Sequence, residues 1–100
     1  MIGLEDRDYI IMLYDFYGDL FNDKQKNYFE EYYFNNLSLG EISEKLGVSR
    51  NAVHKVIQGM EEKLTFYEKK LCLYKKSNII YDIMGKIEDK DINKKLEDLL

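Results

Sequence analysis

The segment from residue 38 to residue 58 constrains this chain most, because it has the residue order of a helix-turn-helix motif. Ser38, followed three residues later by Glu41, forms a capping box and predicts the start of a short helix. Gly47 is the residue type that adopts a positive φ most easily, so it predicts the end of that helix. Ser49 is a preferred N-cap and predicts the start of a second helix. Two helices joined by so short a turn are expected to cross at a steep angle.

Apolar residues at helical spacing give both predicted helices a face that can pack inward. They are Leu39, Ile42 and Leu46 in the first helix, Val48 at the corner, and Ala52, Val53, Val56 and Ile57 in the second helix. The 100 residues contain no proline and only six glycines, which permits long helices and disfavours a β-rich fold. With 45% apolar and 34% charged residues, the chain is expected to form one all-α domain, with the motif inside a small helical bundle.

Two more helices are predicted before the motif. The first covers about residues 6–20, where Tyr9, Met12, Leu13, Phe16, Tyr17 and Leu20 form a broad apolar face. The second is expected to have Asp23 as its N-cap and to end at Asn35 and Asn36.

The second motif helix, fourth in the chain, is predicted to be long, from residue 49 to about residue 74. Its apolar residues follow each other at alternating spacings of four and three: Val53, Ile57, Met60, Leu64, Tyr67, Leu71 and Tyr74. This is a heptad seam over about three repeats, on a helix nearly 40 Å long at 1.5 Å per residue. Because three short helices are not expected to cover such a seam, the sequence predicts a homodimer that uses Val53, Ile57, Met60, Leu64, Tyr67 and Leu71.

The chain is therefore divided into a helix-turn-helix domain at residues 1–76 and a helical segment at residues 77–100. Ser77 or Asn78 is expected to cap this segment, which continues with two short amphipathic pieces. Periodicity alone leaves two alternatives open, in which the segment packs on the same domain or across a dimer.

Five polar side chains lie on the side of the fourth helix opposite its apolar residues: Arg50, Asn51, His54, Lys55 and Gln58. Arginine, asparagine and glutamine are the residue types that read base edges, and lysine contacts phosphate. These five residues are candidates for contact with DNA or RNA. The alternative is an ordinary solvated face. The sequence favours neither nucleic-acid contact nor the solvated face.

The net charge of −4 is unevenly distributed along the chain. Residues 1–48 hold ten acids and four bases, residues 49–76 hold seven bases and three acids, and residues 77–100 hold six acids and four bases. The positive segment coincides with the fourth helix, which keeps nucleic acid among the candidate partners. The acidity of the rest disfavours tight, independent DNA binding.

Other functional classes find little support in the residue pattern. The longest apolar run, Tyr9 to Tyr14, is too short to span a membrane, and the amino terminus lacks the order of a secretory signal. The single Cys72 cannot form an internal disulfide, so a reducing cytoplasm is expected. His54 has no other ligand at metal-binding spacing, and no nucleophile–base pair or phosphate loop is apparent. We therefore expect no catalytic residues, no metal and no cofactor.

The chain resembles the YlxM family of small bacterial helix-turn-helix proteins over roughly residues 12–76. The resemblance rests on residues 13–18 (LYDFYG), 23–26 (DKQK), 32–33 (YY), 38–42 (SLGEI) and 49–54 (SRNAVH). The motif is also similar to the fourth region of primary-type sigma factors. Asn51 and Lys55 depart from the family, whose members often have Gln or Lys at the first position and Asp at the second.

The resemblance implies a non-enzymatic regulatory protein linked to the signal recognition particle, because the family's genes commonly lie beside those of the particle's GTPases. Together with the polar face, this predicts a nucleic-acid-binding regulator of the protein-targeting pathway. The alternative is a protein-interaction module that modulates the GTPase of the particle without binding DNA.

Overall fold

The structure, a computed structural model, describes residues 4–100. This part of the chain contains six α-helices, one short 3-10 helix and no strand, which confirms the predicted all-α class. The elements are α1 (Leu4–Tyr17), η1 (Gly18–Leu20), α2 (Asp23–Tyr33), α3 (Leu39–Leu46), α4 (Arg50–Leu71), α5 (Leu73–Met84) and α6 (Lys90–Glu97).

The capping residues of the motif act as the sequence predicts. Ser38 and Glu41 form the reciprocal capping box of α3, and Gly47 ends that helix in the left-handed region with φ 68°. The Ser49 side chain accepts a hydrogen bond from the backbone N–H of Ala52 and so caps α4. The predicted cap of α2 is wrong by one residue, because Asn22 rather than Asp23 occupies that position.

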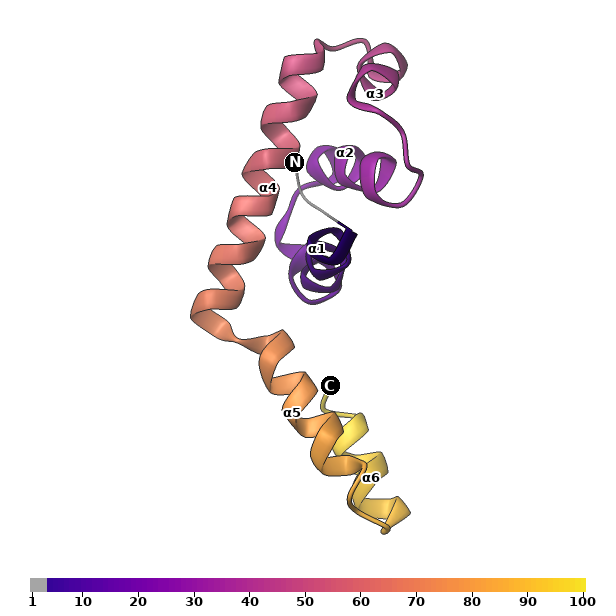
Figure 1. The fold of residues 1–100 in the computed structure, drawn as a ribbon, viewed down its shortest axis with the longest axis vertical. Helices are drawn as coiled ribbons and strands as arrows, with labels where there is room; N and C mark the ends of the chain where they lie inside the picture. The colour runs from indigo at the N-terminus through magenta and orange to yellow at the C-terminus, as the bar shows by residue number, and fades with distance from the viewer. Residues whose placement is uncertain (1–3) are drawn as a thin grey trace.

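Helix α4 is the spine of the fold, and α3, α2 and α1 lie one after another along one side of it (Figure 1). The core lies between this side of α4 and the three shorter helices. Its fully buried side chains come from α1, α2, α3 and α4: Leu13, Tyr17, Phe29, Ile42, Val53, Met60 and Leu64. The heptad seam of α4 is therefore the inner face of the spine.

This arrangement corrects the predicted use of the seam. Val53, Ile57, Met60 and Leu64 are at most 4% exposed within the single chain, so they have no surface left for a partner. The three shorter helices do cover the seam, because they cross α4 at successive heights instead of lying parallel to it (Figure 1). Tyr67 also packs against the core, and only Leu71, at 48% exposure, stays accessible.

Helix α4 ends at Leu71, three residues before the predicted end, because Cys72 adopts a left-handed conformation with φ 55°. A buried cluster holds the break. The Tyr17 hydroxyl donates to Glu68 Oε1 at 2.7 Å and accepts the backbone N–H of Leu73 at 3.1 Å. The two Glu68 oxygens accept the N–H groups of Tyr74 and Lys75 at 3.0 and 3.1 Å, so a side chain of α4 caps α5.

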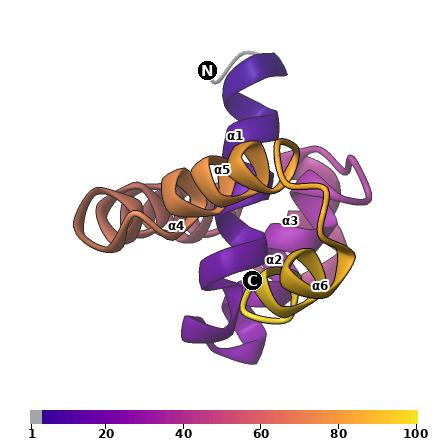
Figure 2. The ribbon, with the colours of Figure 1, turned by 90° about the horizontal axis from the view of Figure 1, so that it is seen from below.

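Helix α5 begins before the predicted segment boundary at residue 77, and Ser77 lies buried inside it rather than at its cap. The helix leaves the end of α4 sideways, and α6 returns beside it (Figures 1 and 2). We call residues 4–71, which form α1 to α4, the body. The first turns of α5 pack on the body through Tyr74, whose ring lies 5.8 Å from that of Tyr9. We call residues 78–100, which lie beyond this contact, the arm.

No helix within residues 4–100 combines the length and the apolar character that crossing a lipid bilayer requires.

Candidate nucleic-acid interface

The turn between α3 and α4 is fixed by local hydrogen bonds. The Ser43 hydroxyl donates to the carbonyl of Val48 at 2.7 Å, and the Val48 N–H donates to the carbonyl of Ser43 at 3.2 Å. The Gly47 N–H also bonds to the carbonyl of Ser43. These bonds, together with the buried Ile42, set the position of α4 relative to α3. None of the exposed side chains of α4 takes part in them.

All five side chains predicted to contact nucleic acid are exposed on the first half of α4. Arg50, His54 and Gln58 follow each other four residues apart and form one row, and Asn51 and Lys55 form a neighbouring row. Since Val53 and Ile57 on the opposite side are buried, the core fixes the direction of both rows.

The charge of this face is positive at the start of α4 and reverses after three turns. Within residues 4–100, neither Arg50 nor Lys55 forms an ion pair, and the positive end of the helix dipole adds to their charge. Glu61 and Glu62 come three and four residues after Gln58, one turn further along the same side. An anionic partner on this face is therefore confined to the first three turns of α4.

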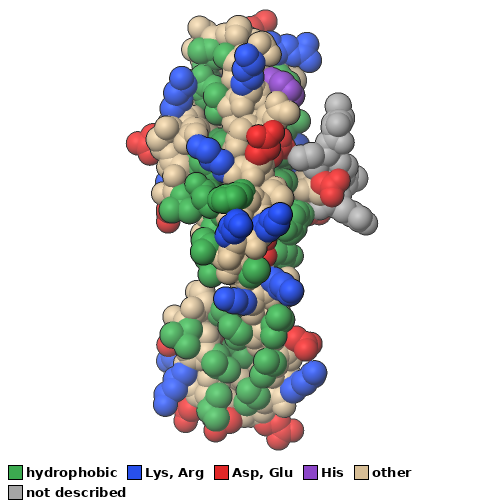
Figure 3. Space-filling view, turned by 90° about the vertical axis from the view of Figure 1, so that its left-hand side faces the viewer, with side chains coloured by type: hydrophobic (Ala, Val, Ile, Leu, Met, Phe, Trp, Pro, Cys, Tyr) green, Lys and Arg blue, Asp and Glu red, His purple; other side chains and the backbone are tan. Residues whose placement is uncertain are grey.

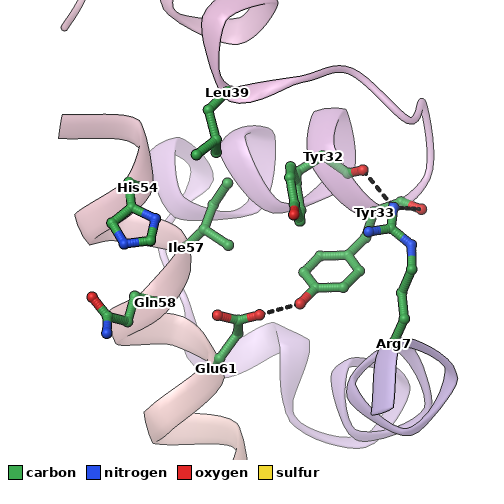
Figure 4. A pocket seen from close by; sticks show the side chains of 8 residues that line it. All are labelled: Arg7, Tyr32, Tyr33, Leu39, His54, Ile57, Gln58 and Glu61. Carbon is green, nitrogen blue, oxygen red and sulfur yellow. Dashed lines mark hydrogen bonds between the residues drawn. The ribbon is translucent and has the colours of Figure 1, made fainter. Parts of the chain in front are cut away.

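Two hollows adjoin the rows and share Leu39 and His54. The first, of about 490 Å³, is lined by Leu39, Arg50, Asn51 and His54. The second, of about 420 Å³, lies where α1, α2, α3 and α4 meet (Figure 4). Its lining is Arg7, Tyr32, Tyr33, Leu39, His54, Ile57, Gln58 and Glu61.

Arg7 at the far wall of the second hollow is held by the end of α2. Its Nη2 donates to the carbonyls of Tyr32 at 2.8 Å and Tyr33 at 3.3 Å, and to Asn36 Oδ1 at 3.2 Å. The guanidinium carbon also lies 5.1 and 4.7 Å from the centroids of the two tyrosine rings. A cation at this place stabilises the carboxyl end of a helix, which gives Arg7 a structural role.

The same hollow contains a hydrogen bond from the Tyr33 hydroxyl to a Glu61 oxygen, which joins α2 to α4 (Figure 4). Burial, followed by this hydrogen bond, raises the pKa of the Tyr33 hydroxyl above its ordinary value of 10.0. The hydroxyl stays protonated at neutral pH and remains a donor.

Five residues of the hollow were not predicted as part of a site: Arg7, Tyr32, Tyr33, Leu39 and Glu61. They come from all four helices, and no spacing in the sequence relates them to His54 or Gln58. Leu39 was predicted only as an inward apolar residue.

The interface offers hydrogen-bonding groups rather than reactive groups. A guanidinium, an ammonium, an imidazole and two amides can donate to phosphates and base edges, and the amides and imidazole can also accept. Within residues 4–100, no three His, Cys, Asp or Glu side chains are grouped so that they could hold a metal ion.

Comparisons with known proteins agree with this architecture. The model of the UPF0122 family, described as "Putative helix-turn-helix protein, YlxM / p13 like", matches residues 4–100. A UPF0122 protein of Caldanaerobacter subterraneus subsp. tengcongensis is 49% identical over 84 residues, which cover 84% of this chain and 69% of that protein. A UPF0122 protein of Ureaplasma urealyticum serovar 10 is 36% identical over 99 residues, which cover 99% of this chain and 100% of that protein. The chain belongs to the UPF0122 family of YlxM- and p13-like helix-turn-helix proteins.

Proposed function

We propose that this protein is a non-enzymatic regulator that binds nucleic acid through Arg50, Asn51, His54, Lys55 and Gln58. The observation that carries the proposal is the exposure of all five side chains on a helix whose opposite side is buried in the core. A buried inner face holds the helix rigidly, and a rigid helix can present side chains to a groove in fixed register.

The distribution of charge supports a particular division of roles. Lys55 and Arg50 supply the positive charge, so Lys55 contacts phosphate and Arg50, at the amino-terminal end of the helix, reads a base edge. Since Glu61 and Glu62 end the positive face after three turns, the contact is short, and we expect modest affinity with strong salt dependence.

The proposal is tested by fluorescence anisotropy with random duplex DNA and with signal-recognition-particle RNA at about 50 and 200 mM salt. Lys55→Glu should weaken binding on every sequence and reduce the salt slope by about one unit. Arg50→Ala should cost about 1–3 kcal/mol on the preferred sequence and relax the preference.

Lys94→Glu is the matched control, because Lys94 is exposed on α6 and the charge change is the same. It should leave binding nearly unchanged. The proposal is refuted if the protein binds neither nucleic acid at low salt, or if Lys94→Glu weakens binding as much as Lys55→Glu.

The cellular setting that we propose is the signal recognition particle pathway. This part of the proposal rests on the resemblance to the YlxM family. The RNA of the particle would serve as a target consistent with both the polar face and this setting.

A second candidate is an interaction module that modulates the GTPase of the particle without binding nucleic acid. It is favoured by the net charge of −4, because an acidic body is repelled by nucleic acid. Its test is GTP hydrolysis by the purified GTPase with and without this protein. An unchanged hydrolysis rate, together with failure to co-purify, would exclude it.

A further inference from the structure

Lysines are concentrated around the junction between α4 and α5. Residues 63–76 hold five lysines and a single acid, Glu68. All five lysines are exposed: Lys63, Lys69, Lys70, Lys75 and Lys76. Lys and Arg side chains gather at the narrow middle of the face in Figure 3, where α4 ends and α5 begins. We call these five residues the lysine cluster.

The positive charge of the lysine cluster is left open. None of its members forms an ion pair anywhere in residues 4–100. Glu68 is buried, and both of its oxygens already accept hydrogen bonds. Helix stability accounts for Lys69 and Lys70, because cations suit the last turn of α4. It does not account for Lys75 and Lys76, which lie at the positive end of the α5 dipole, where a cation is unfavourable.

The lysine cluster is a different surface from the two rows predicted to contact nucleic acid. On α4, Lys63, Phe66 and Lys70 follow each other at spacings of three and four and form one row. At about 100° per residue, this row lies roughly a third of a turn around α4 from the two rows at the start of that helix. Glu61 and Glu62 also separate the two surfaces along the helix. A ligand of the cluster therefore makes a second contact.

Phe66 supplies an aromatic ring within the row. It is 55% exposed, and Lys70 Nζ lies 5.7 Å from the centroid of its ring. Proteins bind single-stranded nucleic acid with lysines around an exposed ring, since the cations contact phosphates and an unpaired base stacks on the ring. The bases of a duplex are stacked on one another, so a duplex can use the lysines but not the ring. Phe66 also lines a hollow of about 420 Å³ that offers a base room, together with Ile10, Glu61, Glu62, Thr65 and Lys69.

The position of Phe66 disfavours a membrane as the partner. A helix that lies in a membrane interface separates its basic face from its apolar face. Here Phe66 lies between Lys63 and Lys70 in the same row, so the ring and the cations face the same ligand.

We propose that the lysine cluster and Phe66 bind an unpaired stretch of nucleic acid, with the lysines on its phosphates and one base stacked on the ring. This inference rests on the proposed function for the class of the ligand, and it adds that the ligand has a single-stranded part. Lys55 and Lys70 are about 22 Å apart along α4 at 1.5 Å per residue. A molecule that contacts both surfaces must span at least this length.

Fluorescence anisotropy of the full chain tests the proposal with an oligouridylate of about 12 nucleotides and a blunt DNA duplex of about 20 base pairs, at about 50 and 200 mM salt. Replacing Lys69, Lys70, Lys75 and Lys76 together by glutamine should weaken oligouridylate binding at least about tenfold at the lower salt and reduce its salt slope by about 3. Phe66→Ala should weaken oligouridylate binding at least about fivefold and leave duplex binding nearly unchanged, because only an unpaired base stacks on the ring.

The matched control replaces four exposed lysines of the arm by glutamine, which removes the same charge: Lys86, Lys90, Lys94 and Lys95. It should bind oligouridylate as the wild type does, and circular dichroism checks that every variant keeps its helices. The proposal is overturned if the cluster variant binds oligouridylate like the wild type, or if the control loses as much affinity. Binding to phosphatidylglycerol vesicles through the cluster, without binding to oligouridylate, would assign the cluster to a membrane and also overturn it.

Lys55→Glu with the duplex separates this inference from the proposed function. If Lys55→Glu weakens duplex binding while the cluster variant keeps its affinity for oligouridylate, the inference alone is refuted. If the cluster variant loses oligouridylate while Lys55→Glu leaves duplex binding unchanged, the inference is supported and the contact through the start of α4 is refuted.

Discussion

The caps of the motif act on their own backbone neighbourhood. Ser38 and Ser49 each accept the N–H group three residues further along the chain, and Gly47 supplies a positive φ. Because each interaction spans only a few residues, these positions could be predicted from the sequence. The outward direction of Arg50 and Lys55 could also be predicted, since it follows from the inward direction of Val53 and Ile57.

Gly47→Ala should lower the free energy of unfolding by about 1–2 kcal/mol, because an alanine is strained at φ 68°. No atom lies within 4 Å of the added methyl group, so the cost is in the backbone and not a clash. Gly59→Ala is the matched control, since Gly59 lies inside α4 with no atom in the way of an added methyl group. This variant should raise the free energy of unfolding by about 0.5–1 kcal/mol. Urea unfolding measures both changes in the free energy of unfolding. Changes of the same sign would contradict the left-handed conformation of Gly47.

Cys72 adopts the left-handed conformation that ends a helix, although cysteine is not a residue type that predicts a helix end. Because glycine and asparagine are the usual residues at φ 55°, the sequence predicted a continuous helix through this position. Cys72→Gly should stabilise the protein or leave it unchanged, while Cys72→Val should cost about 1–2 kcal/mol, since a β-branched residue is strained there. Thermal unfolding of the two variants compares them, and a more stable valine variant would refute the proposed strain.

At the scale of the elements, Glu68 joins α4 to α5. Burial alone would raise the pKa of its carboxyl, but hydrogen bonds from Tyr17 and from the N–H groups of Tyr74 and Lys75 outweigh it and lower the pKa. A residue in the last turn of α4 that caps α5 could not be recognised from spacing, because its partners depend on where the chain turns. The heptad seam shows the same limit. Its periodicity was predictable from neighbouring residues. The helices that cover it could not be predicted, because they are distant from α4 in the sequence.

The lowered pKa of Glu68 makes the junction sensitive to acid. Its contribution to stability is fully present above the ordinary glutamate pKa of about 4.3 and is lost as the pH falls through the lower folded value. Glu68→Gln should therefore cost about 1–2 kcal/mol at pH 7, and the difference from wild type should shrink as the pH falls below about 4. Denaturant unfolding across this range measures it. Exposed Glu62→Gln is the control and should stay within about 0.5 kcal/mol.

On the scale of the whole molecule, the predicted nucleic-acid-binding residues and the arm are separated along the longest axis, which is 53 Å. The two rows of polar side chains at the start of α4 are at one end, the arm is at the other, and α4 connects them (Figure 1). The all-α class and the long fourth helix were predicted, because both depend on composition and periodicity. The hollow beside His54 was not, because it forms only where four helices meet.

The most direct test of the proposed function is amide chemical-shift mapping by NMR on addition of the tighter-binding nucleic acid. The largest shifts should fall on residues 50–58 of α4 and on the adjoining Leu39, with little change in the arm. Lys55→Glu should reduce the shifts at equal concentrations. Shifts that leave residues 50–58 unchanged and fall on α1, α2 or the arm would contradict the proposal that α4 is the recognition helix.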